Sequence, residues 1–192
     1  MEQVSEARAL AERLLAEPLP GRWAHVQGVG REAERIAFVV GDQGDLLIRA
    51  AWLHDIGYAP ELAKAGFHPL DGARYLRDIV GADALLCRLV AHHSGAMNEA
   101  RRRGLADQLT EEFPPVAGLL LDALTCCDMT TGPTGEAVTV EARLDEIATR
   151  YGEGHLITES IAESREAILA AVHAVDAAIA ESSPALRRTT QS

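Results

Sequence analysis

Apolar residues recur at helical spacing along most of this 192-residue chain, and this pattern constrains the fold more than any other feature. One such stripe runs from His25 through Val29 and Ala33 to Ile36, at spacings of three and four residues. Aromatic residues make up only 4% of the chain, while Ala and Leu are abundant. Such a composition favours helices, because Ala and Leu lose little side-chain entropy there. We therefore predict an all-α fold.

The length is that of one domain, and a hydrophobic content of 47% is enough to bury a core without disulfides. We expect a single-domain helical bundle over residues 1–184 and a disordered tail over residues 185–192. Within the bundle, the functional core is expected at about 22–130 and the C-terminal helices at about 139–181. The expected helices cover residues 5–17, 46–55, 82–90, 116–124, 140–151 and 158–180, with two more starting near 22 and 69.

The charge and the cysteines limit the partners and the compartment. A net charge of −11 disfavours binding to nucleic acid, although it is compatible with a small phosphorylated substrate. Three cysteines, two of them adjacent at 126 and 127, indicate a reducing compartment rather than a disulfide framework. We find no apolar run of about 20 residues and no signal peptide, so we expect a cytoplasmic protein without membrane contact.

Polar residues interrupt the apolar helices at positions that should be buried. His25 lies on an apolar stripe, the pair His54 and Asp55 closes the apolar segment 46–53, and Asp128 closes the segment 116–124. Burying such groups without partners is costly. A metal centre that these side chains share would satisfy all of them, and His68, His92 and His93 are candidates for the same centre.

Each of these residues also has a structural interpretation. His25 alone is compatible with a hydrogen-bonded core histidine, and His54 with a cation at a helix C-terminus paired with Asp55. Asp128 is a suitable cap for the loop that follows it. His68 precedes Pro69 and is therefore compatible with a plain helix-start residue.

The order of these residues resembles the HD-domain superfamily of metal-dependent phosphohydrolases, in particular small single-domain bacterial members of the HDIG type. The resemblance is carried by His25 within residues 22–26, by the run His54-Asp55-Ile56-Gly57, and by Asp128. It implies a helical HD-domain bundle in which His25, His54, Asp55 and Asp128 ligate a divalent metal ion.

Two further histidines match the added positions of dinuclear members of that family. By this resemblance, Asp55, His68 and His92 hold a second ion, so that Asp55 bridges the two. A mixed nitrogen and oxygen donor set leaves Fe, Mn, Mg, Ni and Zn open, as well as whether one or two ions bind. For His93, ligation, a hydrogen bond to phosphate and support of its neighbour all remain open.

The implied activity is hydrolysis of a small phosphorylated metabolite, with a nucleotide as the leading candidate. Metal ions at Asp55 would lower the pKa of a shared water, and His93 would protonate the leaving oxygen. Lys64, as a further catalytic group, and Arg74 are expected to contact phosphate because they follow His54 closely in the chain.

Two other functions remain open. The first is a diiron oxygenase with the HD fold that cleaves a small organic substrate with dioxygen, and the second is a non-catalytic nucleotide-sensing module.

The run 101–103 of three arginines is expected to be a solvated helix face, with a phosphate clamp as the alternative. Cys126 and Cys127 are expected to be small buried hydrophobic residues. The oligomeric state is open.

Overall fold

A computed structural model describes residues 2–182. Over this range the chain forms α-helices joined by short 3₁₀ and π turns, and it contains no strand beyond one isolated bridge between Thr131 and Ala137. The predicted all-α fold is therefore confirmed. The helices are α1 Glu2–Leu15, α2 Pro20–Ile36, α3 Gly44–Leu53, α4 His68–Tyr75, α5 Ala84–His92, α6 Ala96–Arg103, α7 Ala106–Glu112, α8 Leu119–Met129, α9 Val140–Tyr151 and α10 Leu156–Ser182.

Helix α3 lies at the centre of the N-terminal half, where it packs against α1, α2, α5 and α8. Its sequence accounts for this position, because the stretch from Leu47 to Leu53 is apolar on most of its circumference. Helix α2 begins with Pro20, which is well suited to a first helical turn. It ends at Ile36, the last residue of the apolar stripe that begins at His25, and a 3₁₀ turn then leads to Gly44.

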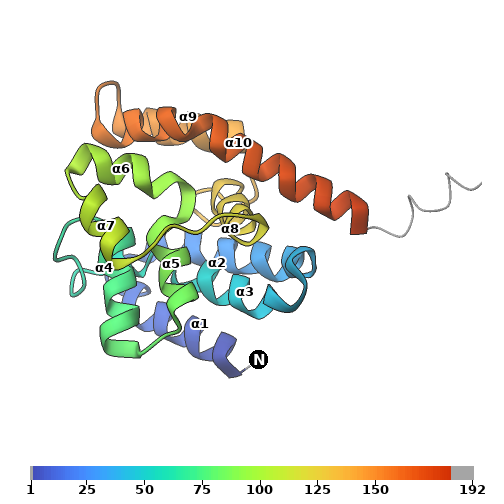
Figure 1. Ribbon diagram of the computed structural model, residues 1–192. Coiled ribbons are helices and arrows are strands. Elements are labelled where there is room, and N and C mark those ends of the chain that lie inside the picture. Colours follow the sequence, from blue (N-terminus) through green and yellow to red (C-terminus); the bar gives the residue numbers. More distant parts are fainter. Residues whose placement is uncertain (1, 183–192) are drawn as a thin grey trace, which may run out of the picture.

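The middle of the chain forms a second group of helices, α4 to α7 (Figure 1). Asp83 caps α5 by accepting a 2.9 Å hydrogen bond from the backbone N–H of Leu86. Helix α5 ends at His92, and the backbone of His93 is extended before the chain turns into α6. This turn places two adjacent histidines in different surroundings.

The C-terminal helices α9 and α10 cover one side of the bundle (Figure 1). The 27-residue α10 packs against α6, α8 and α9, and its last turns extend beyond the rest of the molecule. These helices begin and end within two residues of the expected span 139–181. The expected tail at 185–192 lies outside the described residues.

One connected hydrophobic core extends from Ala7 in α1 to Val175 in α10. Among the described residues, no helix combines the length and the apolar character needed to cross a bilayer. Several buried side chains are polar, and those of His54, Asp55, His93 and Asp128 come from the ends of α3, α5 and α8.

Candidate metal centre

Five elements bring histidines and aspartates to one buried cluster. His25 comes from the buried face of α2, His54 and Asp55 from the end of α3, and Asp128 from the last turn of α8. His68 at the start of α4 and His93 just after α5 complete the cluster. All six side chains are buried except that of His68, which is partly exposed.

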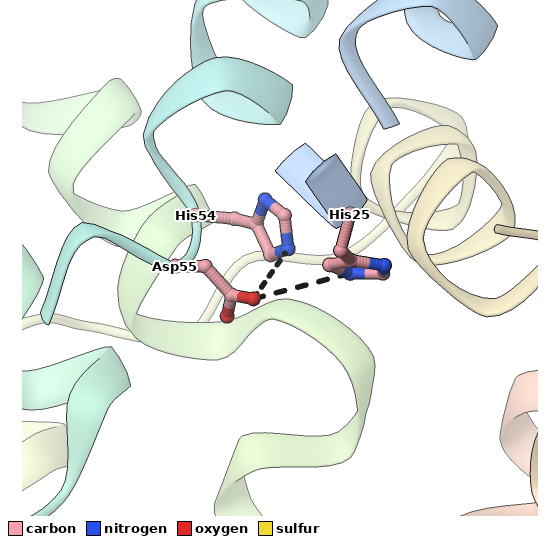
Figure 2. A group of neighbouring side chains, drawn as sticks. All are labelled: His25, His54 and Asp55. Carbon is pink, nitrogen blue, oxygen red and sulfur yellow. Dashed lines mark ion pairs between the residues drawn. The ribbon is translucent and has the colours of Figure 1, made fainter. Parts of the chain in front are cut away.

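The first group of donor atoms surrounds one oxygen of Asp55. Oδ2 of this residue lies 3.4 Å from Nε2 of His54 and 3.9 Å from Nε2 of His25 (Figure 2). Oδ1 of Asp128 lies 3.0 Å from Nε2 of His25 and 3.9 Å from Nε2 of His54. Two imidazoles and two carboxylates thus converge, as the sequence had suggested.

The second group surrounds the other oxygen of Asp55. Oδ1 lies 3.3 Å from Nε2 of His68 and 3.9 Å from Nε2 of His93. The Nε2 atoms of these two histidines are 3.2 Å apart. The ring of His68 also stacks on Tyr58, with centroids 4.0 Å apart. Asp55 therefore presents one oxygen to each group.

Backbone carbonyls fix the orientation of three of the imidazoles. Nδ1 of His25 lies 3.1 Å from the Gly132 carbonyl, and Nδ1 of His54 and of His93 lie 2.8 and 2.7 Å from carbonyls of their own helices. Because a carbonyl can only accept, each Nδ1 carries the proton and donates it. In the neutral ring, Nε2 then offers a lone pair to the cluster, which is the arrangement that supports metal-bound histidines.

The buried nitrogen Nε2 of His54 has no hydrogen-bond partner among the described residues. A fully buried polar atom without a hydrogen-bond partner lowers the stability of the folded state by about 1–3 kcal/mol. Because this atom faces two carboxylate oxygens within a set of nitrogen and oxygen donors, the residues present fit a divalent metal ion.

Arg22 supplies a permanent positive charge beside this cluster. Its Nη1 donates a 2.7 Å hydrogen bond to Oδ2 of Asp55, and its guanidinium lies over the Tyr58 ring. Burial by itself would raise the pKa of Asp55, but the charges of Arg22 and His54 hold that pKa well below its usual range. Both carboxylates of the cluster are therefore ionised, because the pKa of Asp128 is also lowered, against its burial, by His25 and His54.

The histidines respond to the same environment in opposite directions. Burial favours the neutral form of His54, but the carboxylates of Asp55 and Asp128 outweigh it and raise the pKa of His54 to about 9. Without a metal ion His54 is therefore protonated near pH 7, and a metal ion that binds Nε2 has to displace that proton. Burial lowers the pKa of His68 well below its usual value, and it also lowers that of His93. His68 and His93 are therefore neutral near pH 7 and retain a lone pair for ligation.

His92 lies apart from this cluster, contrary to the expectation from the sequence. Its Nε2 lies 2.6 Å from the Phe113 carbonyl, to which it donates, and it belongs to none of the groups of donor atoms that converge. The chain turns sharply between the two histidines, so that His93 takes the place expected for His92. We therefore replace His92 by His93 in the donor set.

Lys64 and Arg74 also lie away from the cluster. Lys64 is exposed in the segment that precedes α4. Arg74 is held by hydrogen bonds to Glu112 of α7. Neither side chain lines the cavity at the metal centre. Closeness in the chain does not bring either residue to the cluster, because Lys64 lies in the exposed segment before α4 and Arg74 lies about 1.7 helical turns after His68, on another face of the helix.

The cavity beside the cluster encloses about 80 Å³ and is closed on one side by α9 and α10. Its charged lining includes three arginines that were not among the predicted site residues, namely Arg22, Arg143 and Arg150. A signal for Arg143 exists in the sequence, since it lies on the apolar stripe formed by Val140, Leu144 and Ile147. Further lining residues are Tyr58, Ser94, Glu99, Met129, Tyr151, Ile157, Ser160, Ile161 and Ser164.

Ser94 supports one of the carboxylates of the cluster. Its hydroxyl donates a 2.5 Å hydrogen bond to Oδ2 of Asp128, and its backbone has a positive φ of 47°. Asp128 lies within α8 and contacts His25 and Ser94, so it does not cap the loop after Met129. His68 does stand at a helix start, but its side chain turns to Asp55 rather than to its own helix.

The remaining candidates have structural roles. In the arginine run 101–103, Arg102 pairs with Glu159 and Glu163 of α10, and Arg103 pairs with Glu99. Burial raises the pKa of Cys126 to about 12, and the thiol of Cys127 is shifted in the same direction. These cysteines are therefore protonated near neutral pH and are poor metal ligands.

Comparison with known proteins identifies the family. The family model of the HD domain matches residues 22–151, which include every residue of the donor cluster. No curated protein sequence and no solved structure gives a significant match. The match does not distinguish the HDIG subtype from the rest of the family. Since it covers more than half of the chain, this protein belongs to the HD domain family, whose members are generally metal-dependent hydrolases.

Proposed function

We propose that this protein is a phosphohydrolase that releases phosphate from a small phosphorylated metabolite, with nucleotides as the first substrates to test. We further propose two metal ions, one held by His25, His54, Asp55 and Asp128 and the other by Asp55, His68 and His93. The observation that carries this proposal is the position of Asp55. Its two oxygens face separate groups of donor atoms, which is what a bridging carboxylate requires.

Divalent ions bound there would neutralise phosphoryl oxygens and lower the pKa of a water toward neutrality. The residues of the chain hold the donor atoms in place. The backbone carbonyls orient His25, His54 and His93, and Ser94 orients Asp128. Arg22 keeps Asp55 ionised and lines the cavity, so its guanidinium is also close to where a phosphate would enter.

This arrangement changes the role proposed for His93. Its Nδ1 donates to the Val90 carbonyl, and its Nε2 lies within the second donor group. Both nitrogens are thus engaged, and the role that we propose for His93 is ligation rather than proton transfer to the leaving oxygen.

The size of the cavity favours a small phosphorylated group. About 80 Å³ is well below the 300–1,000 Å³ or so that is typical of sites enclosing a whole drug-sized ligand. We therefore propose that the phosphate end enters this cavity and that the rest of the substrate lies against the apolar lining from α9 and α10. Ile147, Tyr151 and Ile161 supply that lining.

Phosphate release from a panel of nucleotides and small phosphate esters tests this function. Protein purified without chelators is assayed with Mn²⁺ or Mg²⁺ beside an Asp55→Asn variant, and elemental analysis gives the metal content. We expect about two metal ions per chain in the wild type. The rate of phosphate release should be lower in Asp55→Asn by a factor of roughly 10² or more, as for residues essential to metal catalysis.

The other outcomes decide between the remaining functions. Two tightly bound, redox-active irons with oxygen uptake and no phosphate release would instead identify the diiron oxygenase. Metal binding with nucleotide binding but without turnover would leave the sensing module. A protein that takes up no metal after reconstitution would contradict the proposed centre.

A further inference from the structure

Two arginines of α9 face the cavity at the metal centre, although the ligation of metal does not need them. Arg143 and Arg150 both line it together with Arg22. The same three arginines border a second hollow of about 230 Å³, whose lining also includes Gly21 and Pro133. These three guanidinium groups border both hollows, and we refer to them as the arginine wall.

The charge on this wall is only partly compensated. Arg22 is paired with Asp55, but Arg143 and Arg150 share a single carboxylate, that of Glu146. Glu136 is also close enough to Arg143 for its pKa to be lowered a little by that charge, but its carboxylate is exposed and accepts hydrogen bonds from Thr134. Two other carboxylates of the lining have partners elsewhere, because Asp128 contacts His25 and Glu99 pairs with Arg103. Arg143 and Arg150 thus have one carboxylate as ion-pair partner between them.

Arg143 is also buried to an extent that is unusual for arginine. Its side chain is 5% exposed, and its Nε has no hydrogen-bond partner among the described residues. Arginine is rarely buried unless its donors are satisfied. The ion pairs with Glu146 are compatible with a purely structural row of charges along α9. Such surface pairs keep the guanidinium group in solvent, where water satisfies Nε, whereas the side chain of Arg143 is buried.

We infer that Arg143 and Arg150 form a subsite for a second anionic group of the ligand, distinct from the phosphate at the metal centre. Guanidinium groups recognise carboxylate and phosphate oxygens through paired hydrogen bonds, and the free Nε of Arg143 is such a donor. The inference rests on the proposed function for the position of the first phosphate. It adds that the preferred ligands carry two acidic ends.

Non-hydrolysable phosphonates test the subsite by binding alone. The probes are propylphosphonate, with one acidic group, and 3-phosphonopropionate, which carries a carboxylate at the other end of a chain of the same length. Isothermal titration measures their dissociation constants on the full-length, metal-loaded protein. We expect 3-phosphonopropionate to bind roughly tenfold more tightly, as a charge-assisted hydrogen bond would provide. Propane-1,3-diphosphonate in the same assay distinguishes a preference for phosphate from one for carboxylate.

Substitutions assign the effect to these residues. Arg150→Met and Arg143→Met should abolish the preference, which is measured in each variant as the ratio of the two dissociation constants. Arg101→Met is the matched control, because Arg101 is an exposed arginine that contacts Asn98 and does not line the cavity. Arg150 is about one third exposed, so its variant is expected to fold even where the loss of the buried Arg143 destabilises the chain.

Equal binding of the two probes by the wild type would overturn the subsite, as would failure of both to bind or a preference that persists in Arg150→Met. These results are separate from the proposed function. Preferential binding without phosphate release from any ester would leave the subsite and contradict the hydrolase. Phosphate release without the preference would do the reverse.

Discussion

At the scale of single residues, the position of His93 is the observation with the most direct consequence. Its Nδ1 is anchored on the Val90 carbonyl and its Nε2 faces Asp55, whereas the neighbouring His92 donates to the Phe113 carbonyl. The two histidines are adjacent and buried, so substituting each in turn compares ligation with packing at nearly the same place.

We predict that His93→Ala loses about one metal ion per chain, because it removes a donor of the second group. His92→Ala should keep the metal content of the wild type and lose only stability, by roughly 1–3 kcal/mol for the unsatisfied carbonyl and the lost packing. Elemental analysis of the metal content and thermal unfolding measure the two effects. Metal loss in His92→Ala with full loading of His93→Ala would contradict this assignment.

At the scale of elements, helix α4 packs against the 3₁₀ turn Ile56–Tyr58, which directly follows Asp55, and this contact holds His68 near Asp55. Gly57 makes this contact possible. A Cβ at this position would lie 2.0 Å from the His68 carbonyl oxygen and 2.7 Å from the backbone nitrogen of Gly72. Since both are backbone atoms, only a shift of the whole of α4 would relieve the overlap.

We predict that Gly57→Ala displaces α4 and with it His68. The expected result is a destabilisation of roughly 1–3 kcal/mol, as for other overpacked sites, together with weaker binding of the second metal ion. Gly21→Ala is the matched control, because a Cβ there meets no described atom within 4 Å. Thermal unfolding and metal titration check both variants. A Gly57→Ala protein with wild-type stability and metal content would show that this contact does not position His68.

At the scale of the whole molecule, one core joins the helices that carry the donors, so metal binding and folding are coupled. The cluster buries two ionised carboxylates, and without a metal ion Arg22 and the protonated ring of His54 balance their charge. A metal ion would take the place of the His54 proton. A ligand that binds only the folded state stabilises it by mass action.

We predict that Mn²⁺ at about 100 times its dissociation constant stabilises the fold by about 2.7 kcal/mol, which raises Tm by roughly 5–10 °C. Asp128→Asn should lose most of this shift, because it removes one donor charge from the first group. Scanning calorimetry with and without a chelator measures the difference. A Tm that is independent of metal in the wild type would argue against a metal site within the folded core.

The sequence by itself determined the fold class, because periodic apolar stripes and a composition rich in Ala and Leu leave few alternatives to helices. The need of buried polar side chains for partners selected a wider set of histidines and aspartates, and the resemblance to the HD-domain superfamily singled out His25, His54, Asp55 and Asp128 among them. These four residues do converge in the structure.

Only the tertiary structure decided between His92 and His93. Helix α5 is buried on several faces from Leu86 onward, so periodicity assigns no preferred direction to either histidine. The structure also showed that Lys64 and Arg74 do not line the cavity at the metal centre. Arg143 and Arg150 line it instead, from helix α9 much further along the chain. Contacts of this kind depend on how helices cross, and the crossing is set by packing across the whole core rather than by any local pattern.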